Sequence, residues 1–335
     1  MQYFRLLIST LCLITSHTAT IAQDSIAQKR ITGYVSTEVN YGRHEKGTKP
    51  LIDFPHVIAG ATVQMGRGWS VVTEVEYERF RTDGQWGNNF RDNYTTNKFY
   101  VNKSWSQALN VKAGIVDIPV GTTNSGGPAL TIYDPLDEST LMPMTWHEGG
   151  AALWGSYRKV HYEVGAYVYP TAPLKDSRLL GAAARVGIMP VDGLDLSLSC
   201  FYGSSKEGMV QRQNPNLAEF DHVHHTAFDI AYVANGWTID GQLTASSCHS
   251  NKAAGVEIGY DVATLLGWSC CSIIPFTRYD GYYHVEGVSC NKYTVGLNTS
   301  LPLGFVIKAE TGRTFISDDS CTSFFDLSLG WQCEF

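Results

Sequence analysis

The sequence is short of charged residues and of long hydrophobic runs, and it has no C-x-x-C cysteine pair. Charged residues make up 17% of the 335 residues, against about 25% in an average globular protein. The formal net charge of −7 argues against nucleic acid or another polyanion as a partner. Beyond the N-terminus no segment approaches the roughly 18 uninterrupted apolar residues of a membrane-spanning helix, so no such helix is predicted.

The first 22 residues are predicted to be a secretory signal peptide that leaves a single domain, residues 23–335. One positive charge, Arg5, precedes a short apolar core, and Thr20 and Ala22 form a small-residue end. The core is too short to cross a bilayer. Cys12 lies inside it without the context of lipoprotein processing, so a lipid anchor is not predicted.

The remaining cysteines are odd in number once Cys12 is removed, and none forms a C-x-x-C pair. Cys290 and Cys321 fall in predicted loops at the same end of the fold. A disulfide between them is one hypothesis for an oxidising compartment. The alternative is that the cysteines serve as scattered small apolar residues.

Alternation of polar and apolar residues is the main pattern present, and residues 325–335 show it most strictly. Every second residue there is apolar: Phe325, Leu327, Leu329, Trp331, Cys333 and Phe335. A period of two places one set on each side of a strand. A strand that closes on Phe335, with Trp331 four residues before it, is similar to the signal that directs outer-membrane barrels to their assembly machinery.

Sixteen such segments are predicted along the chain. They are residues 31–41, 54–65, 69–80, 97–106, 109–121, 147–157, 160–169, 179–189, 194–203, 225–234, 237–246, 255–265, 271–281, 292–300, 305–315 and 325–335. Connections after even-numbered segments are short, and those after odd-numbered segments are mostly longer. No helical segment of note is predicted.

An even number of strands, with short turns at one end and long loops at the other, is typical of an outer-membrane barrel. The predicted fold is therefore an all-β, transmembrane antiparallel β-barrel of about 16 strands. A soluble double sandwich has no reason to sort its loops by end. Residues 147–157 and 271–281 are ambiguous in the parity of their faces, and a β-bulge would explain either.

The connection at residues 122–146 is the third long loop, and it is unusually apolar for an exposed loop. We expect it to fold into the lumen, with a surface loop as the alternative. The residues predicted at the resulting constriction are Asp134, Asp137, Glu138, His147 and Glu148.

Parts of this region resemble a known family. Residues 99–114, 119–124 and 137–150, followed by Ala-Leu-Trp-Gly at 152–155, are similar to porins of the phosphate-selective O/P type. The resemblance implies a sixteen-stranded, usually trimeric porin of the bacterial outer membrane, in contact with lipid and lipopolysaccharide. It also implies that the third long loop narrows the pore. Phosphate selectivity in that family depends on inward ladders of Arg and Lys.

The predicted lumen differs from that family because its inward charges are mostly acidic. The residues predicted to line it include Glu74, Glu76, Glu78, Lys98, Lys112, Glu163 and Arg185, with further acids at Asp195, Asp229, Asp240, Glu257, Asp261 and Glu310 and bases at Lys308 and Arg278. Rings of carboxylates favour cations. The predicted function is thus passive diffusion of small solutes or ions, with cation or neutral-solute preference. A phosphate- or anion-selective porin is the alternative.

Signals for other functions are weak. The three glutamates Glu74, Glu76 and Glu78 could hold Ca²⁺, and the histidines of residues 221–225 a divalent metal, but a hydrated surface is the simpler reading of both. No catalytic motif is present, so no enzyme, cofactor or metal is predicted. The rivals are a barrel enzyme, with a Ser/His or Asp/His site involving His147, His161 or His225, and a plugged structural barrel.

Overall fold

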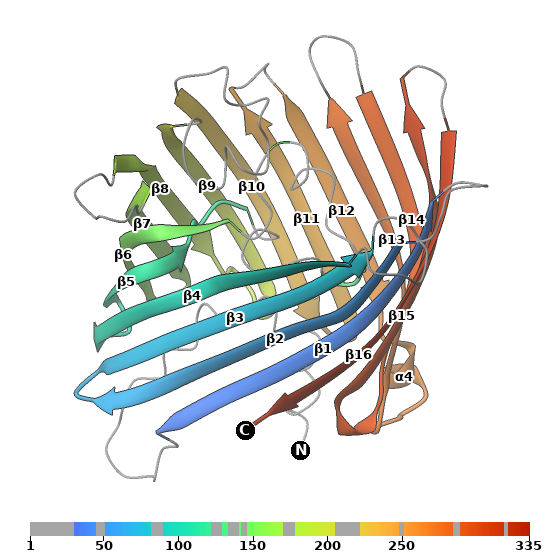
Figure 1. Ribbon diagram of the computed structural model, residues 1–335, viewed down its shortest axis with the longest axis horizontal. Coiled ribbons are helices and arrows are strands. Elements are labelled where there is room, and N and C mark those ends of the chain that lie inside the picture. The colour runs from blue at the N-terminus through green and yellow to red at the C-terminus, as the bar shows by residue number, and fades with distance from the viewer. Residues whose placement is uncertain are drawn as a thin grey trace.

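The described backbone forms one antiparallel sheet that closes on itself (Figure 1). The structure is a computed structural model and describes residues 30–44, 51–81, 90–121, 129–132, 141, 146–169, 178–204, 222–247, 251–283, 289–317 and 321–335. Its strands follow one another around the barrel in chain order, and the last pairs with the first. The predicted sixteen-stranded barrel is confirmed.

The strands have the following bounds: β1 Ile31–His44, β2 Leu51–Gly66, β3 Trp69–Arg81, β4 Phe90–Ser106, β5 Leu109–Asp117, β6 His147–Tyr157, β7 Val160–Tyr169, β8 Arg178–Ile188, β9 Leu194–Ser204, β10 His222–Ala234, β11 Trp237–Ser246, β12 Lys252–Tyr260, β13 Ser272–Tyr283, β14 Ser289–Ser300, β15 Phe305–Ile316 and β16 Cys321–Glu334.

Closure occurs along the seam between β1 and β16, which pair from Tyr34↔Glu334 to His44↔Phe324. Gly33 and Phe335 extend the seam by exchanging two backbone hydrogen bonds of 3.0 and 2.9 Å. In a hydrocarbon environment an unpaired backbone group costs several kcal/mol. The seam removes both free edges of the sheet and so satisfies this requirement.

The two ends of the barrel differ in their connections, as predicted. Two-residue turns join β2 to β3, β4 to β5, β6 to β7 and β10 to β11, and Arg67, Arg158 and Asn235 in these turns have positive φ. Hairpin turns of this length need such angles. Strand β1 begins and strand β16 ends at this end of the barrel (Figure 1).

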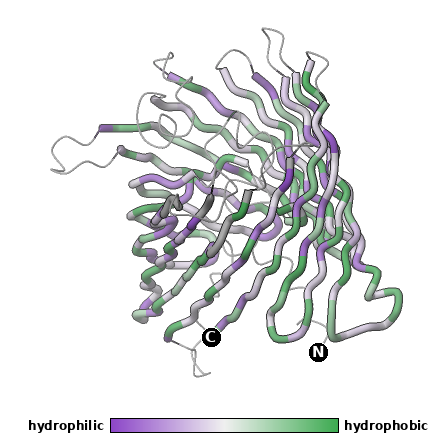
Figure 2. Tube along the Cα trace, turned by 45° about the vertical axis from the view of Figure 1, so that its right-hand side comes forward, coloured by the Kyte–Doolittle hydropathy of each residue, from purple (hydrophilic) through white to green (hydrophobic). Residues whose placement is uncertain are grey.

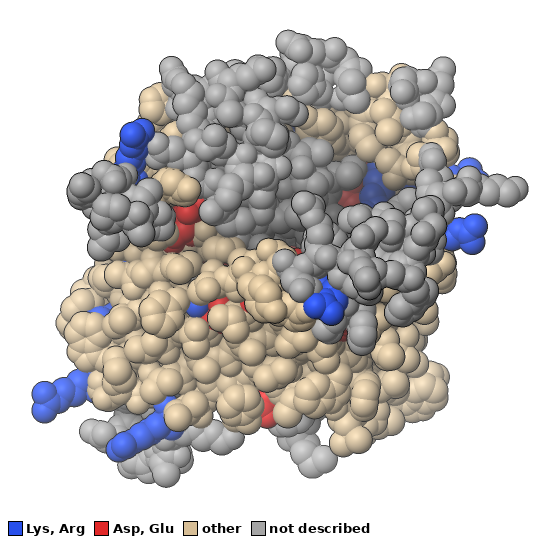
Figure 3. Space-filling model, viewed as in Figure 1, with Lys and Arg blue, Asp and Glu red and all other residues tan. Residues whose placement is uncertain are grey.

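The two faces of the sheet are inverted relative to a soluble protein. Large apolar residues point outward and are exposed, as at Val164, Leu198 and Val295. Polar residues alternate with them and are buried inside, as at Glu163 and Ser197. Figure 2 shows this alternation along the strands. In the view of Figure 3 the outer surface over β1 to β4 carries few charged side chains. Such a surface fits lipid.

Several strands are longer or shorter than predicted. β4 begins at Phe90 rather than at residue 97, and β5 ends at Asp117 rather than at residue 121. The added part of β4 carries polar residues such as Thr96 on its outer face, which weakens the local apolar pattern. β12 ends at Tyr260 because Asp261 caps a one-turn helix, α4 (Val262–Leu265), through a 3.0 Å hydrogen bond from Ala263 N.

The two strands of ambiguous parity contain no bulge. The pairings of β6 and β13 run without register shifts. Their inner faces instead carry large apolar or aromatic residues: Trp154, whose indole donates to Asn102, and Ile274 and Phe276. Register shifts occur elsewhere, and four of them lie between β1 and β4.

Two local predictions about side chains were wrong. His222 and His224 belong to β10, which begins at residue 222 and not at residue 225. Cys290 and Cys321 lie in β14 and β16 and are free thiols. By strand parity Cys290 faces inward and Cys321 outward, so the sheet separates them.

Within the described residues, no helix is long and apolar enough to cross a membrane.

The outward face predicts a test of orientation in the membrane. Val75, in the middle of β3, points outward and is 48% exposed, whereas Val72 of the same strand points inward. We expect Val75→Arg to lower the free energy of unfolding by about 2–4 kcal/mol, because the charge enters lipid near the bilayer midplane. Val72→Arg is the matched control and should cost less than half as much. Urea titration of the barrel in lipid vesicles measures both, and equal losses would contradict the assigned faces.

Candidate functional site: the inner wall of the barrel

The connection between β5 and β6 contacts the inner wall at several separate places. Its described residues are 118–121, 129–132, 141 and 146. Ile118, Val120, Leu141 and Trp146 are buried against inward side chains of β7 to β10 and β12, forming an apolar cluster with Tyr167, Leu180, Ala183, Phe201, Val223, Ala227 and Ala253. The apolar residues of this connection thus pack against one side of the inner wall.

Trp146 occupies the centre of that cluster. Its ring centroid lies 4.5 Å from that of Phe201 on β9 and 5.7 Å from that of His225 on β10. His225 is fully buried there. Because Trp146 directly precedes β6, this packing directs the end of the connection along the wall.

Arg185 of β8 fixes the beginning of the connection. Its guanidinium donates to Gly121 O at 2.7 Å, while Gly121 N donates to Ser199 Oγ at 3.0 Å. Gly121 has φ +75°, and a Cβ there would lie 2.6 Å from Oε1 of Gln242. The backbone angle therefore favours glycine at this position.

Residues 130–132 contact a different part of the wall. Leu130 N donates to Glu257 Oε1 on β12 at 3.2 Å, and Ile132 N donates to Glu310 Oε2 on β15 at 2.9 Å. Lys308 of β15 donates to Thr131 O at 2.9 Å. Charged inward side chains therefore hold the backbone of the connection.

Apolar contacts of Leu130 accompany these hydrogen bonds. Leu130 is buried against Ile274 and Phe276, the inward apolar residues of β13. A Cβ at Gly259 of β12 would approach Leu130 Cδ1 to 2.7 Å. The connection thus contacts β8 and β9 near its beginning and β12, β13 and β15 further along, across several intervening strands.

The predicted constriction residues fall into two groups. Asp134, Asp137 and Glu138 lie outside the described residues. His147 and Glu148 are the first residues of β6 and are both buried. His147 pairs in register with Asp117 at the end of β5.

Three bases that were predicted to line the lumen lie beside carboxylates of other strands. Lys98 lies 3.3 Å from Glu74, and Lys112 lies 2.8 Å from Glu163. Arg185 lies 3.5 Å from Asp229. Pairing reduces the free positive charge that each base presents to a solute.

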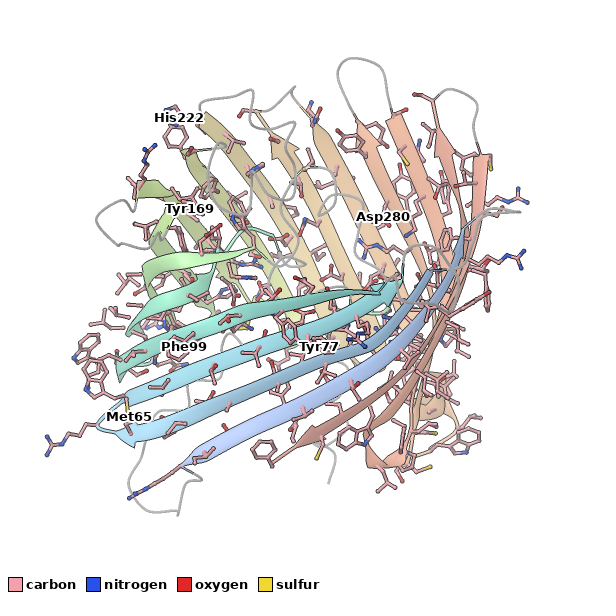
Figure 4. All side chains as sticks on the ribbon, in the orientation of Figure 1. Met65, Tyr77, Phe99, Tyr169, His222 and Asp280 are labelled. Atoms are coloured by element: carbon pink, nitrogen blue, oxygen red, sulfur yellow. The ribbon has the colours of Figure 1, made fainter. Side chains whose placement is uncertain are left out.

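A similar ion-pair network lies on β12 and β13. Arg278 of β13 lies 3.2 Å from Glu257 and 2.8 Å from Asp280. Figure 4 labels Asp280 on the inner side of β13. Arg278 and both carboxylates are almost wholly buried.

The sequence analysis missed several inward groups among the described residues, including Glu38, His56, Asp280, Lys292 and Asp326. Period-two parity could have found the three acids, but the register shifts near His56 obscure its strand. Asp261, predicted in the lumen, instead caps α4 and accepts from Ile273 N at 3.0 Å.

The three histidines named for a barrel enzyme lie in different surroundings. His161 pairs with Asp195 at 2.8 Å, while His225 packs in the aromatic cluster. His147 lies at the start of β6. The structure thus places one Asp/His pair, Asp195 and His161, on the inner wall. The other two histidines, His147 and His225, lie on β6 and β10.

No protein-family model matches the chain, and no curated protein matches it. Solved structures do. The anion-selective porin of Comamonas acidovorans matches at 10% identity and a TM-score of 0.65, over 90% of this chain and 98% of that one. OmpF of Salmonella typhi, in complex with daunomycin, matches at 11% identity and a TM-score of 0.62, over 90% and 97%. In vitro folded OmpT of Vibrio cholerae, in a trimer form, matches at 10% identity and 0.59, over 90% and 99%.

These likenesses show the fold, which is that of the porins. The closed sheet, its apolar outer surface and these neighbours together identify a bacterial outer-membrane β-barrel protein, as predicted. They do not single out the phosphate-selective O/P type. The prediction that the chain is no enzyme is corrected. OmpT structures match at 9–12% identity, and a likeness in fold neither assigns nor excludes an activity.

The Lys112–Glu163 pair predicts a double-mutant cycle. It joins β5 to β7 across β6, and both side chains are about 10% exposed or less. Lys112→Met leaves a buried carboxylate without its base, and we expect a loss of about 3–5 kcal/mol in the free energy of unfolding.

The control is Lys112→Met combined with Glu163→Leu, which removes both charges and should recover most of the loss. Urea titration in lipid vesicles measures each variant. A double variant as unstable as the single one would show that the pair is not the source of the effect.

Proposed function

We propose that this protein is a porin that lets small hydrophilic solutes or ions diffuse passively across the outer membrane. The observation that carries the proposal is the polar inner wall of a closed, sixteen-stranded barrel whose third long connection contacts that wall. A wall lined by charged side chains suits a hydrated path.

The connection between β5 and β6 is proposed to set the width of the pore. Support comes from its contacts with β8 and β9 near its beginning and with β12, β13 and β15 further along. In the sequence, Asp134, Asp137 and Glu138 fall between residues 130–132 and Trp146, which contact the wall on either side of them along the chain. They are proposed to narrow the path together with His147 and Glu148.

The pore is proposed to prefer cations. Lys98, Lys112, Arg185 and Arg278 are each bound to at least one carboxylate, and inward acids outnumber inward bases. The excess charge that a solute meets is therefore negative, and in a narrow channel of low dielectric it biases permeation. Phosphate selectivity is the expectation from the O/P-type motifs. It would need inward bases that are not paired with carboxylates, and few such bases remain.

Assembly in the membrane completes the proposal. The exposed, apolar side of β16, with Trp331 and Phe335 near its end, is proposed to guide recognition by the barrel assembly machinery. A homotrimer in contact with lipid and lipopolysaccharide is also proposed, supported by the trimer form of the OmpT structure.

The role of the connection can be tested at one of its anchors. Glu310→Leu removes the acceptor that holds Ile132 N, and we expect a higher and noisier single-channel conductance because the connection loses a fixed contact. Glu310→Gln is the matched control: it is equally neutral but keeps an acceptor, so its conductance should stay close to that of the parent. Planar-bilayer recordings that show the same conductance for both variants would reject the anchoring role.

Ion selectivity gives a second test. In a salt gradient at low ionic strength we expect the reversal potential of the parent to show cation preference. The preference should fade near molar salt, since the Debye length falls from about 10 Å at 0.1 M to about 3 Å at 1 M. Lysine at Asp134, Asp137 and Glu138 should shift the reversal potential toward anions. An anion-selective parent at low salt would overturn the proposed preference, and a barrel that does not conduct would overturn the porin itself.

A further inference from the structure

We propose that His56, Glu76 and Glu78 form a binding site for a divalent transition-metal cation such as Zn²⁺ on the inner wall of β2 and β3. Nε2 of His56 lies 2.5 Å from Oε1 of Glu76 and 3.8 Å from Oε1 of Glu78. One ligand atom from each residue lies within 4.8 Å of the other two. Two ligands of a tetrahedral ion with bonds of about 2.1 Å lie about 3.4 Å apart. Small side-chain rotations would therefore complete the geometry.

Each of the three ligands is held from behind by another side chain. Nδ1 of His56 lies 3.0 Å from Oε1 of Glu38 on β1. The second oxygen of Glu76 accepts from Asn97 at 2.7 Å, and that of Glu78 from Asn93 at 3.3 Å. Metal-binding histidines commonly have such a carboxylate on the far ring nitrogen, and ligating carboxylates are likewise hydrogen-bonded. The atoms left facing one another are those that a metal would bind.

The register of the sheet brings this arrangement together. Glu38 pairs with His56, His56 with Glu78, and Glu78 with Asn93, so one row crosses β1 to β4. Register shifts flank the row at Glu38/Asn40, at Asp53/His56 and at Glu74/Val75. The last shift accompanies the inward contact of Asn97 with Glu76, beside Lys98, which faces the same side. Bulges of this kind re-aim side chains at functional sites.

Charge and access also suit a cation. The side chains of His56, Glu76 and Glu78 are 16%, 14% and 29% exposed, so the cluster is sheltered but reachable from the lumen. Lys98, the nearby base on β4, contacts Glu74 and Asp117 instead. With Glu38, the cluster holds three carboxylates around one imidazole, and a divalent cation would offset their charge.

The ligand set selects the class of metal. An imidazole nitrogen with two carboxylates suits zinc and related ions. Ca²⁺ takes six to eight oxygen ligands, which this cluster does not supply. The inference differs from a calcium site on the three glutamates, because Glu74 contacts Lys98 and Tyr34 rather than the cluster. It also does not depend on the proposed conductance.

Calorimetric titration of the folded barrel in detergent with Zn²⁺ tests the site. Thiols are alkylated, and the exposed His222 and His224 are changed to alanine in every sample, because these groups also bind zinc. We expect one saturable site in this background and none with Ca²⁺. His56→Gln keeps hydrogen-bond capacity but removes the metal-binding nitrogen, and should weaken binding more than 10-fold. Glu38→Ala should weaken it by about 10–100-fold through loss of the group behind the imidazole.

His161→Gln is the matched control, since His161 pairs with Asp195 on other strands of the inner wall, and its loss should leave zinc affinity unchanged. Heat-modified mobility on gels verifies that each variant is folded. Glu78→Gln provides a second ligand change should His56→Gln fail to fold. The proposal would be overturned if the background showed no saturable zinc site. It would also be overturned if His56→Gln and Glu78→Gln both bound zinc with the affinity of the background.

The pH dependence supplies a further readout. Zinc binds a neutral imidazole and would take the place of the hydrogen bond between His56 Nε2 and Glu76. Binding should therefore release protons, and its affinity should fall as the pH is lowered. Titrations in two buffers of different ionisation enthalpy measure the protons released. If zinc bound without releasing protons, the ion would not be bound at His56, and the proposal would be wrong.

Discussion

Backbone hydrogen bonding in lipid is the constraint on which this structure depends. A strand that crosses a bilayer has no water to satisfy its N–H and C=O groups, so the sheet must close. Closure along β1 and β16, continued by Gly33 and Phe335, leaves each strand with two neighbours. Side chains are then divided by parity alone. Apolar residues meet lipid, and polar residues are left to organise a lumen.

The lumen is organised into two kinds of surface. On β7 to β10 the inner face carries apolar side chains such as Tyr167 and Phe201, which receive the connection around Trp146. Elsewhere it carries ion pairs, as at Arg278 and Glu257. Some carboxylates of this second surface also accept backbone N–H groups of the connection. The same charges therefore line the lumen and hold the connection between β5 and β6.

Much of the fold could be predicted from the sequence because period two is a local signal. Strands such as β7 and β11 have the bounds that alternation gives. The signal fails where an inward residue contacts something other than water. Ile274 and Phe276 face inward but pack on Leu130, a residue more than a hundred positions away. Parity in β13 is ambiguous for that reason, and no bulge is needed to explain it.

The side-chain clusters are harder to predict because they depend on register between strands. Alternation places Glu76 and Glu78 on the inner face, but it does not say which residue of β2 lies beside them. That is decided by the shift between Asp53 and His56, which brings His56 opposite Glu78. A bulge adds one residue to a strand without a marked change in composition. A sequence pattern thus gives the side on which a residue lies, whereas its partners across the sheet follow from irregularities that leave little local trace.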